Sequence, residues 1–105
     1  MMKKDISVEM INEALRLPER VEDYSFEDAI RLTQTAIKVK DSPFLHFSLA
    51  CFYSSGNKIT ESLIQLEIAL RQGFEDWEKV ANDPSLFEAR RTREFWQTVE
   101  KYIQN

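Results

Sequence analysis

Histidine and cysteine, the side chains best suited to acid–base and nucleophilic chemistry near neutral pH, occur once each in this 105-residue chain. His46 lies in an apolar run, and no nucleophile or orienting carboxylate stands at helical spacing from it. Cys51 lies between Ala50 and Phe52, and burial among apolar neighbours raises the pKa of a thiol and makes it inert. We therefore expect both to be packed side chains, and the sequence predicts no catalytic residue and no enzyme.

The carboxylates, glycines and arginines do not form a ligand motif either. The acidic residues lack the alternating loop pattern of a calcium site, and one cysteine with one histidine cannot form a zinc cluster. Gly56 and Gly73 are isolated, which excludes a glycine-rich phosphate loop. Arg90, Arg91 and Arg93 are the densest basic group, but a net charge of −4 argues against a nucleic-acid surface. We expect no metal, no cofactor and no nucleic acid.

Length and composition describe one globular domain over residues 1–105, with 43% hydrophobic and 30% charged residues. No stretch approaches the 18 apolar residues of a transmembrane helix. The first residues are not followed by an apolar run of signal-peptide length. The sequence therefore predicts no membrane partner and a cytoplasmic location.

Apolar residues recur every three to four positions along most of the chain, which predicts helices. The expected helices span about residues 5–17, 26–40, 43–54, 61–71, 76–81, 83–91 and 93–104. Ser25 and Asp28 have the spacing of a capping box. Thr60 is the expected N-cap of the fourth helix, and Gly73 is the expected residue just past its end.

The same periodicity predicts which side chains face inward. The third helix is apolar nearly all round, so it must be covered on most sides. Ile64 and Ile68 give the fourth helix a second apolar stripe, which predicts contacts both with the helix before it and with the chain after it. Phe95, Trp96, Val99, Tyr102 and Ile103 are the apolar positions of an amphipathic last helix. The inward residues predicted for the second helix are Phe26, Ala29, Ile30, Thr33, Ala36 and Ile37.

Two parts of the chain repeat at a displacement of 33 residues. Ala29-Ile30 and Ala36-Ile37 recur as Ser62-Leu63 and Ala69-Leu70. The second unit also carries His46-x-x-Leu49-Ala50-x-x-Tyr53, and it is followed by Gly73-Phe74-Glu75-Asp76-Trp77 and Asp83-Pro84-Ser85-Leu86. On these motifs, residues 26–102 resemble the tetratricopeptide repeat (TPR) family, with His46 at the family's tryptophan position.

The resemblance implies an all-α, short, right-handed TPR-like array of about two repeat units. An N-terminal helix would stand in for the missing first helix, and the last helix would cap the C-terminal end. The resemblance places Trp77 and Trp96 in the core, where the family's tail folds back over the last repeat; the alternative is that they are exposed anchors of an interface. Ala50, Ser62 and Ala69 are small where the two helices of a unit approach closely. The expected function is a protein–protein interaction module, an adaptor or scaffold that binds a peptide segment or helix of a partner.

In TPR folds the first helix of each unit lines the ligand groove. Carried over onto this chain, the partner-binding positions are Phe44, Phe47, Cys51, Ser54 and Ser55, which share one side of the third helix. Their apolar character predicts that the groove takes an apolar segment, with the two phenylalanines as anchors. An internal alternative stays open, in which Val8, Ile11 and Leu15 of the chain's own first helix fill the groove.

Two other functional classes also fit the sequence. A small acidic helical chain suits an inhibitor or immunity-type protein that blocks a partner enzyme. The apolar third helix also suits a homo-oligomerising structural domain. The expected oligomeric state is a monomer or a weak homodimer.

Overall fold

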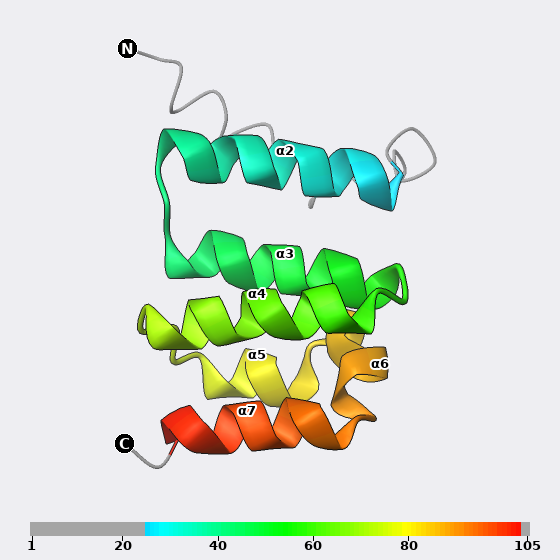
Figure 1. Ribbon diagram of the computed structural model, residues 1–105, viewed down its shortest axis with the longest axis vertical. Coiled ribbons are helices and arrows are strands. Elements are labelled where there is room, and N and C mark those ends of the chain that lie inside the picture. Colours follow the sequence, from blue (N-terminus) through cyan, green and yellow to red (C-terminus); the bar gives the residue numbers. More distant parts are fainter. Residues whose placement is uncertain (1–24, 104–105) are drawn as a thin grey trace.

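The computed structural model describes residues 25–103, so the predicted helix at residues 5–17 lies outside the described residues. Figure 1 shows the long helices layered side by side, with α2, α3 and α4 alternating in direction and α7 running in the same direction as α4. Within the described range all regular secondary structure is helical, which confirms the predicted all-α helical array. Its elements are α2 (Phe26–Val39), α3 (Pro43–Ser55), α4 (Ile59–Arg71), α5 (Trp77–Asn82), the 3-10 helix η2 (Pro84–Leu86), α6 (Phe87–Arg90) and α7 (Arg93–Ile103).

Local sequence signals set most helix ends. The predicted capping box of α2 is confirmed: the Ser25 hydroxyl accepts a hydrogen bond from the Asp28 amide at 3.1 Å, and the Asp28 carboxylate accepts from the Ser25 amide. Ser42 caps α3, because its hydroxyl accepts from the Leu45 amide at 3.2 Å. Gly73 follows α4 with φ of 104°, in the left-handed region that favours glycine.

The start of α4 differs from the prediction. The helix begins at Ile59 and its N-cap is Lys58, whose side chain makes no capping hydrogen bond, so the predicted cap at Thr60 is wrong. The preceding turn explains the difference. Asn57 adopts a φ of 63°, and the Lys58 amide donates to the Tyr53 carbonyl at 2.8 Å. This turn brings the backbone into helical geometry before Thr60 is reached.

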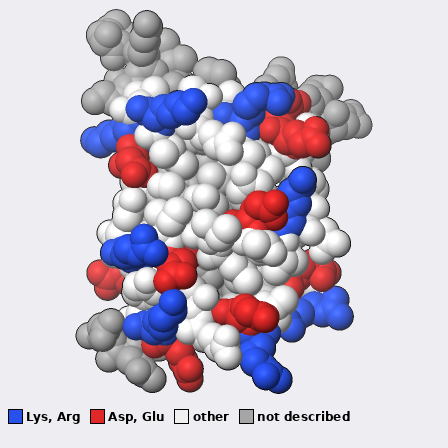
Figure 2. Space-filling view, in the orientation of Figure 1, with Lys and Arg blue, Asp and Glu red and all other residues white. Residues whose placement is uncertain are grey.

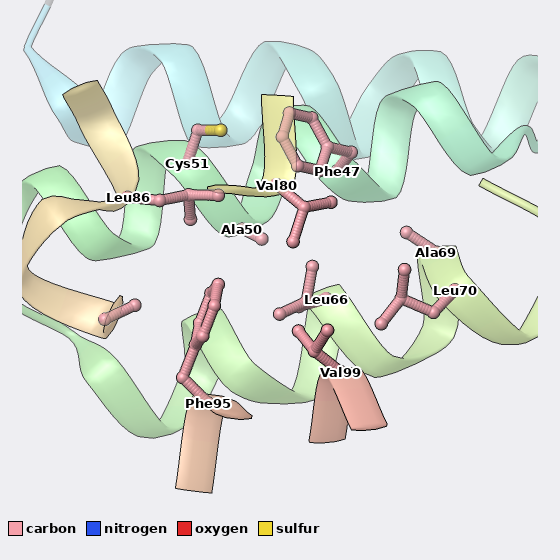
Figure 3. Packing of buried hydrophobic residues seen from close by; sticks show 11 residues of the cluster. Phe47, Ala50, Cys51, Leu66, Ala69, Leu70, Val80, Leu86, Phe95 and Val99 are labelled. Atoms are coloured by element: carbon pink, nitrogen blue, oxygen red, sulfur yellow. The ribbon is translucent and has the colours of Figure 1, made fainter. Parts of the chain in front are cut away.

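The main core lies between α3, α4 and the C-terminal segments. Figure 3 shows side chains of α3, α4 and α7 pointing toward a common centre. Phe95 and Val99 of α7 are both buried in it, so α7 covers α4 as the amphipathic tail predicts. The buried members of this core are Phe47, Ala50, Cys51, Leu66, Ala69, Leu70, Val80, Leu86, Ala89, Phe95 and Val99.

The helix α2 packs on α3 through a smaller cluster, in which Ala36 and Leu45 are buried and Leu32 and Ile37 are partly buried. Phe26 was expected to face inward with them, but it is 50% exposed. As the first residue of α2, it lies beyond the helix surface that α3 covers, and its ring lies near the α3–α4 turn at Gly56.

Two further apolar positions are more exposed than predicted. Trp96 is 46% exposed, and its indole N–H donates to the Arg90 carbonyl at 2.9 Å, whereas its neighbour Phe95 is fully buried. Adjacent helical residues point about 100° apart, so α7 can direct only one of these two rings into the core. The second position is Ile64, which is 53% exposed. Trp77, in contrast, packs against the core as expected.

Candidate functional site: an aromatic groove

A pocket of about 390 Å³ lies between α3 and the α5–η2 segment. We call it the aromatic groove, because four phenylalanines line it. Three parts of the chain build it: the first residue of α2, one side of α3, and the segment that runs from α5 into η2. Its lining residues are Phe26, Phe44, Phe47, Ser48, Cys51, Phe52, Ser55, Lys79, Asp83 and Ser85.

Four of the five predicted partner-binding residues line this groove: Phe44, Phe47, Cys51 and Ser55. The fifth, Ser54, is fully buried. Its hydroxyl accepts a hydrogen bond from the backbone amide of Ala89 at 3.2 Å, so it joins α3 to α6. The four lining residues share one side of α3, as their spacing requires.

The two predicted anchors differ in exposure. Phe47 is 3% exposed and stacks on Phe74, with ring centroids 4.3 Å apart. It therefore forms the wall of the groove and belongs to the core. Phe44 is 44% exposed and Phe26 is 50% exposed, so these two rings are the ones that a partner can cover.

Sequence reasoning missed the other half of the groove. Lys79, Asp83 and Ser85 reach it because the C-terminal segment folds back beside α3. The sequence predicts helices around these residues but carries no signal for which side of α3 they meet. The exposure of Phe26 had one sequence signal, because Phe26 directly follows the Ser25 cap and is therefore the first residue of its helix. The helical pattern nevertheless assigned its side chain to the interior.

Polar groups that line the groove are hydrogen-bonded to one another. The Asp83 carboxylate accepts hydrogen bonds from the Ser85 amide at 2.9 Å and hydroxyl at 2.5 Å. Ser55 donates to the Ser85 carbonyl at 3.4 Å. Burial raises the pKa of the Cys51 thiol to about 12, against the opposing effect of its hydrogen bond with Ser85. The thiol is therefore protonated at neutral pH and contributes an apolar surface to the groove.

His46 lies away from the groove, in a polar network that the sequence did not predict. Its Nε2 lies 2.7 Å from an Asp41 carboxylate oxygen, and its Nδ1 lies 2.7 Å from the Gln65 amide oxygen. A carboxylate therefore orients His46, although it does not stand at helical spacing from it. Asp41 precedes α3 and escapes a search at helical spacing. About 140° of helical rotation separates His46 from Cys51, so the two do not form a catalytic pair.

The Asp41 carboxylate also accepts a hydrogen bond from Gln72 at 3.2 Å. Desolvation by its neighbours acts to raise the pKa of the exposed Asp41, but the hydrogen bonds with Gln72 and His46 outweigh it and lower the pKa below its ordinary value. These contacts tie the α2–α3 connection to α4. The network thus holds the start of α3, which carries Phe44, against α4.

The charged side chains do not concentrate one sign on the face shown in Figure 2: acidic and basic groups lie mostly around its margin, with uncharged side chains between them. Across residues 25–103, no group of three or more histidine, cysteine or acidic side chains is arranged to hold a metal ion. No helix within that range is both long enough and apolar enough to cross a membrane.

Comparison with known proteins gives one partial relative. The chain is 30% identical over 81 residues to a chloroplastic protein of Arabidopsis thaliana. The match covers 73% of this chain and 24% of that protein, so the chain spans about a quarter of its relative. No family model matches the chain. No solved structure matches it either.

Proposed function

We propose that this chain is a TPR-like protein-interaction module that holds an apolar segment of a partner protein in the aromatic groove. The observation that carries this proposal is the exposure of Phe26 and Phe44 at the mouth of a pocket whose wall, formed by Phe47, is fixed in the core. Exposed rings beside a preformed apolar wall are what an interface anchor needs, because burying them on binding removes apolar surface from water.

The packing of α3 on α4 supports the TPR-like part of the proposal. Ala50, Ser62 and Ala69 are all fully buried, where the repeat pattern places small residues between paired helices. The Ser62 hydroxyl donates to the Ala50 carbonyl at 2.7 Å, which requires the two helices to be close. Larger side chains at these positions would hold the helices apart.

The groove chemistry favours binding over catalysis. Asp83 is occupied by Ser85, the Cys51 thiol is protonated at neutral pH, and His46 lies elsewhere. The remaining charged lining residue is Lys79, at the end of the groove formed by α5. A segment with an apolar anchor suits this lining better than a small polar substrate does.

A pair of matched substitutions tests the proposal. Phe44→Ser removes an exposed ring from the groove, and Phe87→Ser removes an exposed ring from α6, outside the groove. Tagged wild-type and variant proteins are used to capture partners from an extract of the source cells. We expect a protein captured by the wild type to be retained by Phe87→Ser and lost by Phe44→Ser.

The opposite outcome is also defined. If the captured proteins are the same for all three, or if both variants lose them equally, the aromatic groove is not the binding site. Far-UV circular dichroism of each variant shows whether a loss reflects unfolding. Sedimentation of the wild type alone shows whether the groove is occupied by a second copy of the chain.

A cytoplasmic location is part of the proposal. The name of the Arabidopsis relative places that protein in the chloroplast, and the match covers 24% of it. A fluorescent fusion of the full coding sequence, imaged in the source cells, decides between the two compartments. Fluorescence confined to an organelle would contradict the cytoplasmic location.

A further inference from the structure

We propose a second interaction surface, between α4 and α7, that binds a basic amphipathic helix of a partner protein. A hollow of about 440 Å³ lies between these two helices. We call it the α4–α7 hollow. Among the described residues it shares no lining residue with the aromatic groove, so it is a separate surface. Its lining residues are Ile59, Thr60, Leu63, Ile64, Glu67, Glu94 and Thr98.

The floor of this hollow is apolar and fixed. Ile59 and Leu63 are partly buried and pack against the main core. Ile64, one residue further along α4, is 53% exposed although α7 lies beside this helix. The fold therefore presents a large aliphatic side chain to solvent at the edge of a preformed depression, which is a feature typical of interaction sites.

The charged residues that line this hollow determine the sign of the charge that a partner must carry. Both charged lining residues, Glu67 and Glu94, are acidic, and no lysine or arginine of residues 25–103 lines the hollow. Glu67 is occupied, since its carboxylate accepts hydrogen bonds from Lys101 at 2.8 Å and Tyr102 at 3.0 Å. Glu94 lies exposed in the first turn of α7, with no ion pair to a residue in the described range.

A third carboxylate lies beside Ile64 on α4, outside the lining of the hollow. Glu61 is exposed and precedes Ile64 by three residues, so the two lie on the same face of α4. An apolar side chain flanked by Glu61 and Glu94 is complementary to a segment that carries an apolar residue between lysines or arginines. Such charge complementarity speeds association and rejects acidic competitors.

The directions of the two helices favour a helical occupant. Figure 1 shows that α4 and α7 run in the same direction, and residues of both helices line the hollow. A third helix packs into such a depression through residues spaced three and four apart.

The test uses two labelled model peptides, one an amphipathic helix of leucine and lysine and the other the same pattern with glutamate in place of lysine. Binding to the full chain is measured by fluorescence anisotropy at low salt. We expect the lysine peptide to bind and the glutamate peptide not to bind. Ile64→Ser, which leaves the charge unchanged, should weaken binding of the lysine peptide by about tenfold. Phe87→Ser, an exposed apolar control outside both surfaces, should leave it unchanged.

A charge variant keeps the proposal falsifiable if Ile64→Ser unfolds. Glu94→Lys should weaken binding of the lysine peptide and strengthen binding of the glutamate peptide. Equal binding by the wild type, Ile64→Ser and Glu94→Lys overturns the proposal, as does an absence of binding to the wild type. Loss of binding with Phe44→Ser but not with Ile64→Ser also overturns it, because the peptide would then occupy the aromatic groove. If Ile64→Ser converts a dimer to a monomer in sedimentation, the occupant is a second copy and the proposal is wrong.

Discussion

The central helix pair α3–α4 is covered very differently on its two sides. On the C-terminal side, large side chains such as Phe95 and Leu86 are fully buried in a cluster that spans α3 to α7. On the other side, α2 contributes the small side chain of Ala36 to a cluster whose other buried member is Leu45. Among residues 25–103, the two sides therefore hold unequal amounts of buried apolar surface, which is the largest favourable contribution to folding.

Polar contacts strengthen the same side. Glu67 of α4 joins α7 through Lys101 and Tyr102, while the hydrogen bond between the side chains of Gln34 and Tyr53 that joins α2 to α3 is long, at 3.4 Å. Within residues 25–103, buried apolar surface and short polar contacts are therefore both concentrated between α3 and α7. The α2 side, which borders the aromatic groove at Phe26, then adjusts at lower cost when a partner binds.

Deletion of residues 93–105 should have the largest effect. It removes Phe95 and Val99 from the core and exposes Leu66 and Leu70 of α4. The lost burial is comparable to the total stability of a domain, about 5–15 kcal/mol, so we expect loss of cooperative unfolding. Thermal unfolding followed by circular dichroism measures it. A truncated chain that melts like the full chain and stays monomeric would show that α7 is a binding arm instead of a cap.

Phe47→Ala should come next, because its ring is 3% exposed and stacked on Phe74. We expect a loss of about 3–4 kcal/mol in the free energy of unfolding. The matched variant Phe44→Ala, on the same helix but 44% exposed, should cost less than about 1 kcal/mol. Urea denaturation of both variants measures the difference. Equal costs would mean that the wall and the mouth of the groove are not distinct.

The two sides of the central pair are compared directly by Phe95→Ala and Leu32→Ala. Phe95 is fully buried on the C-terminal side, and Leu32 is partly buried on the α2 side. We expect losses of about 4 kcal/mol and about 1–2 kcal/mol in the free energy of unfolding. Chemical denaturation at one temperature gives both values. A larger loss for Leu32→Ala would reverse the comparison.

The smallest loss in the free energy of unfolding should come from the substitution Glu67→Gln. Hydrogen bonds from Lys101 and then Tyr102 lower its pKa below the ordinary value of 4.5. A lowered folded-state pKa stabilises the protein fully above the ordinary pKa, and this contribution is lost as the pH falls through the folded-state pKa. Glu67→Gln should therefore cost about 0.5–1 kcal/mol at neutral pH.

The pH dependence separates this contribution from other carboxylates. The difference between the wild type and Glu67→Gln should shrink as the pH falls below 4.5. Asp41→Asn is the matched control, because the pKa of Asp41 is also lowered but its contacts lie at the α2–α3 connection. If Glu67→Gln has the same cost at low and neutral pH, the ion pair with Lys101 does not contribute to the stability of the α4–α7 contact.

Local features of this protein were predictable from the sequence. The capping box at Ser25 and Asp28 and the helix end at Gly73 depend on residues within one turn of each other, so spacing alone identifies them. Likewise, helix geometry fixes the relative directions of Phe44, Phe47 and other residues on one helix. The α3 half of the aromatic groove was predictable for this reason.

Only the tertiary structure decided which other segment of the chain each helix face packs against. Periodicity offered Phe95 and Trp96 equally as core residues, and packing against α4 and α6 selected Phe95. Asp41 meets Gln72, and Lys79 reaches the groove, through the folding back of segments separated by loops. Sequence periodicity gives the direction of a side chain around its own helix axis. The distance between two helices depends on the summed volumes of all side chains packed between them, and no local pattern contains that sum.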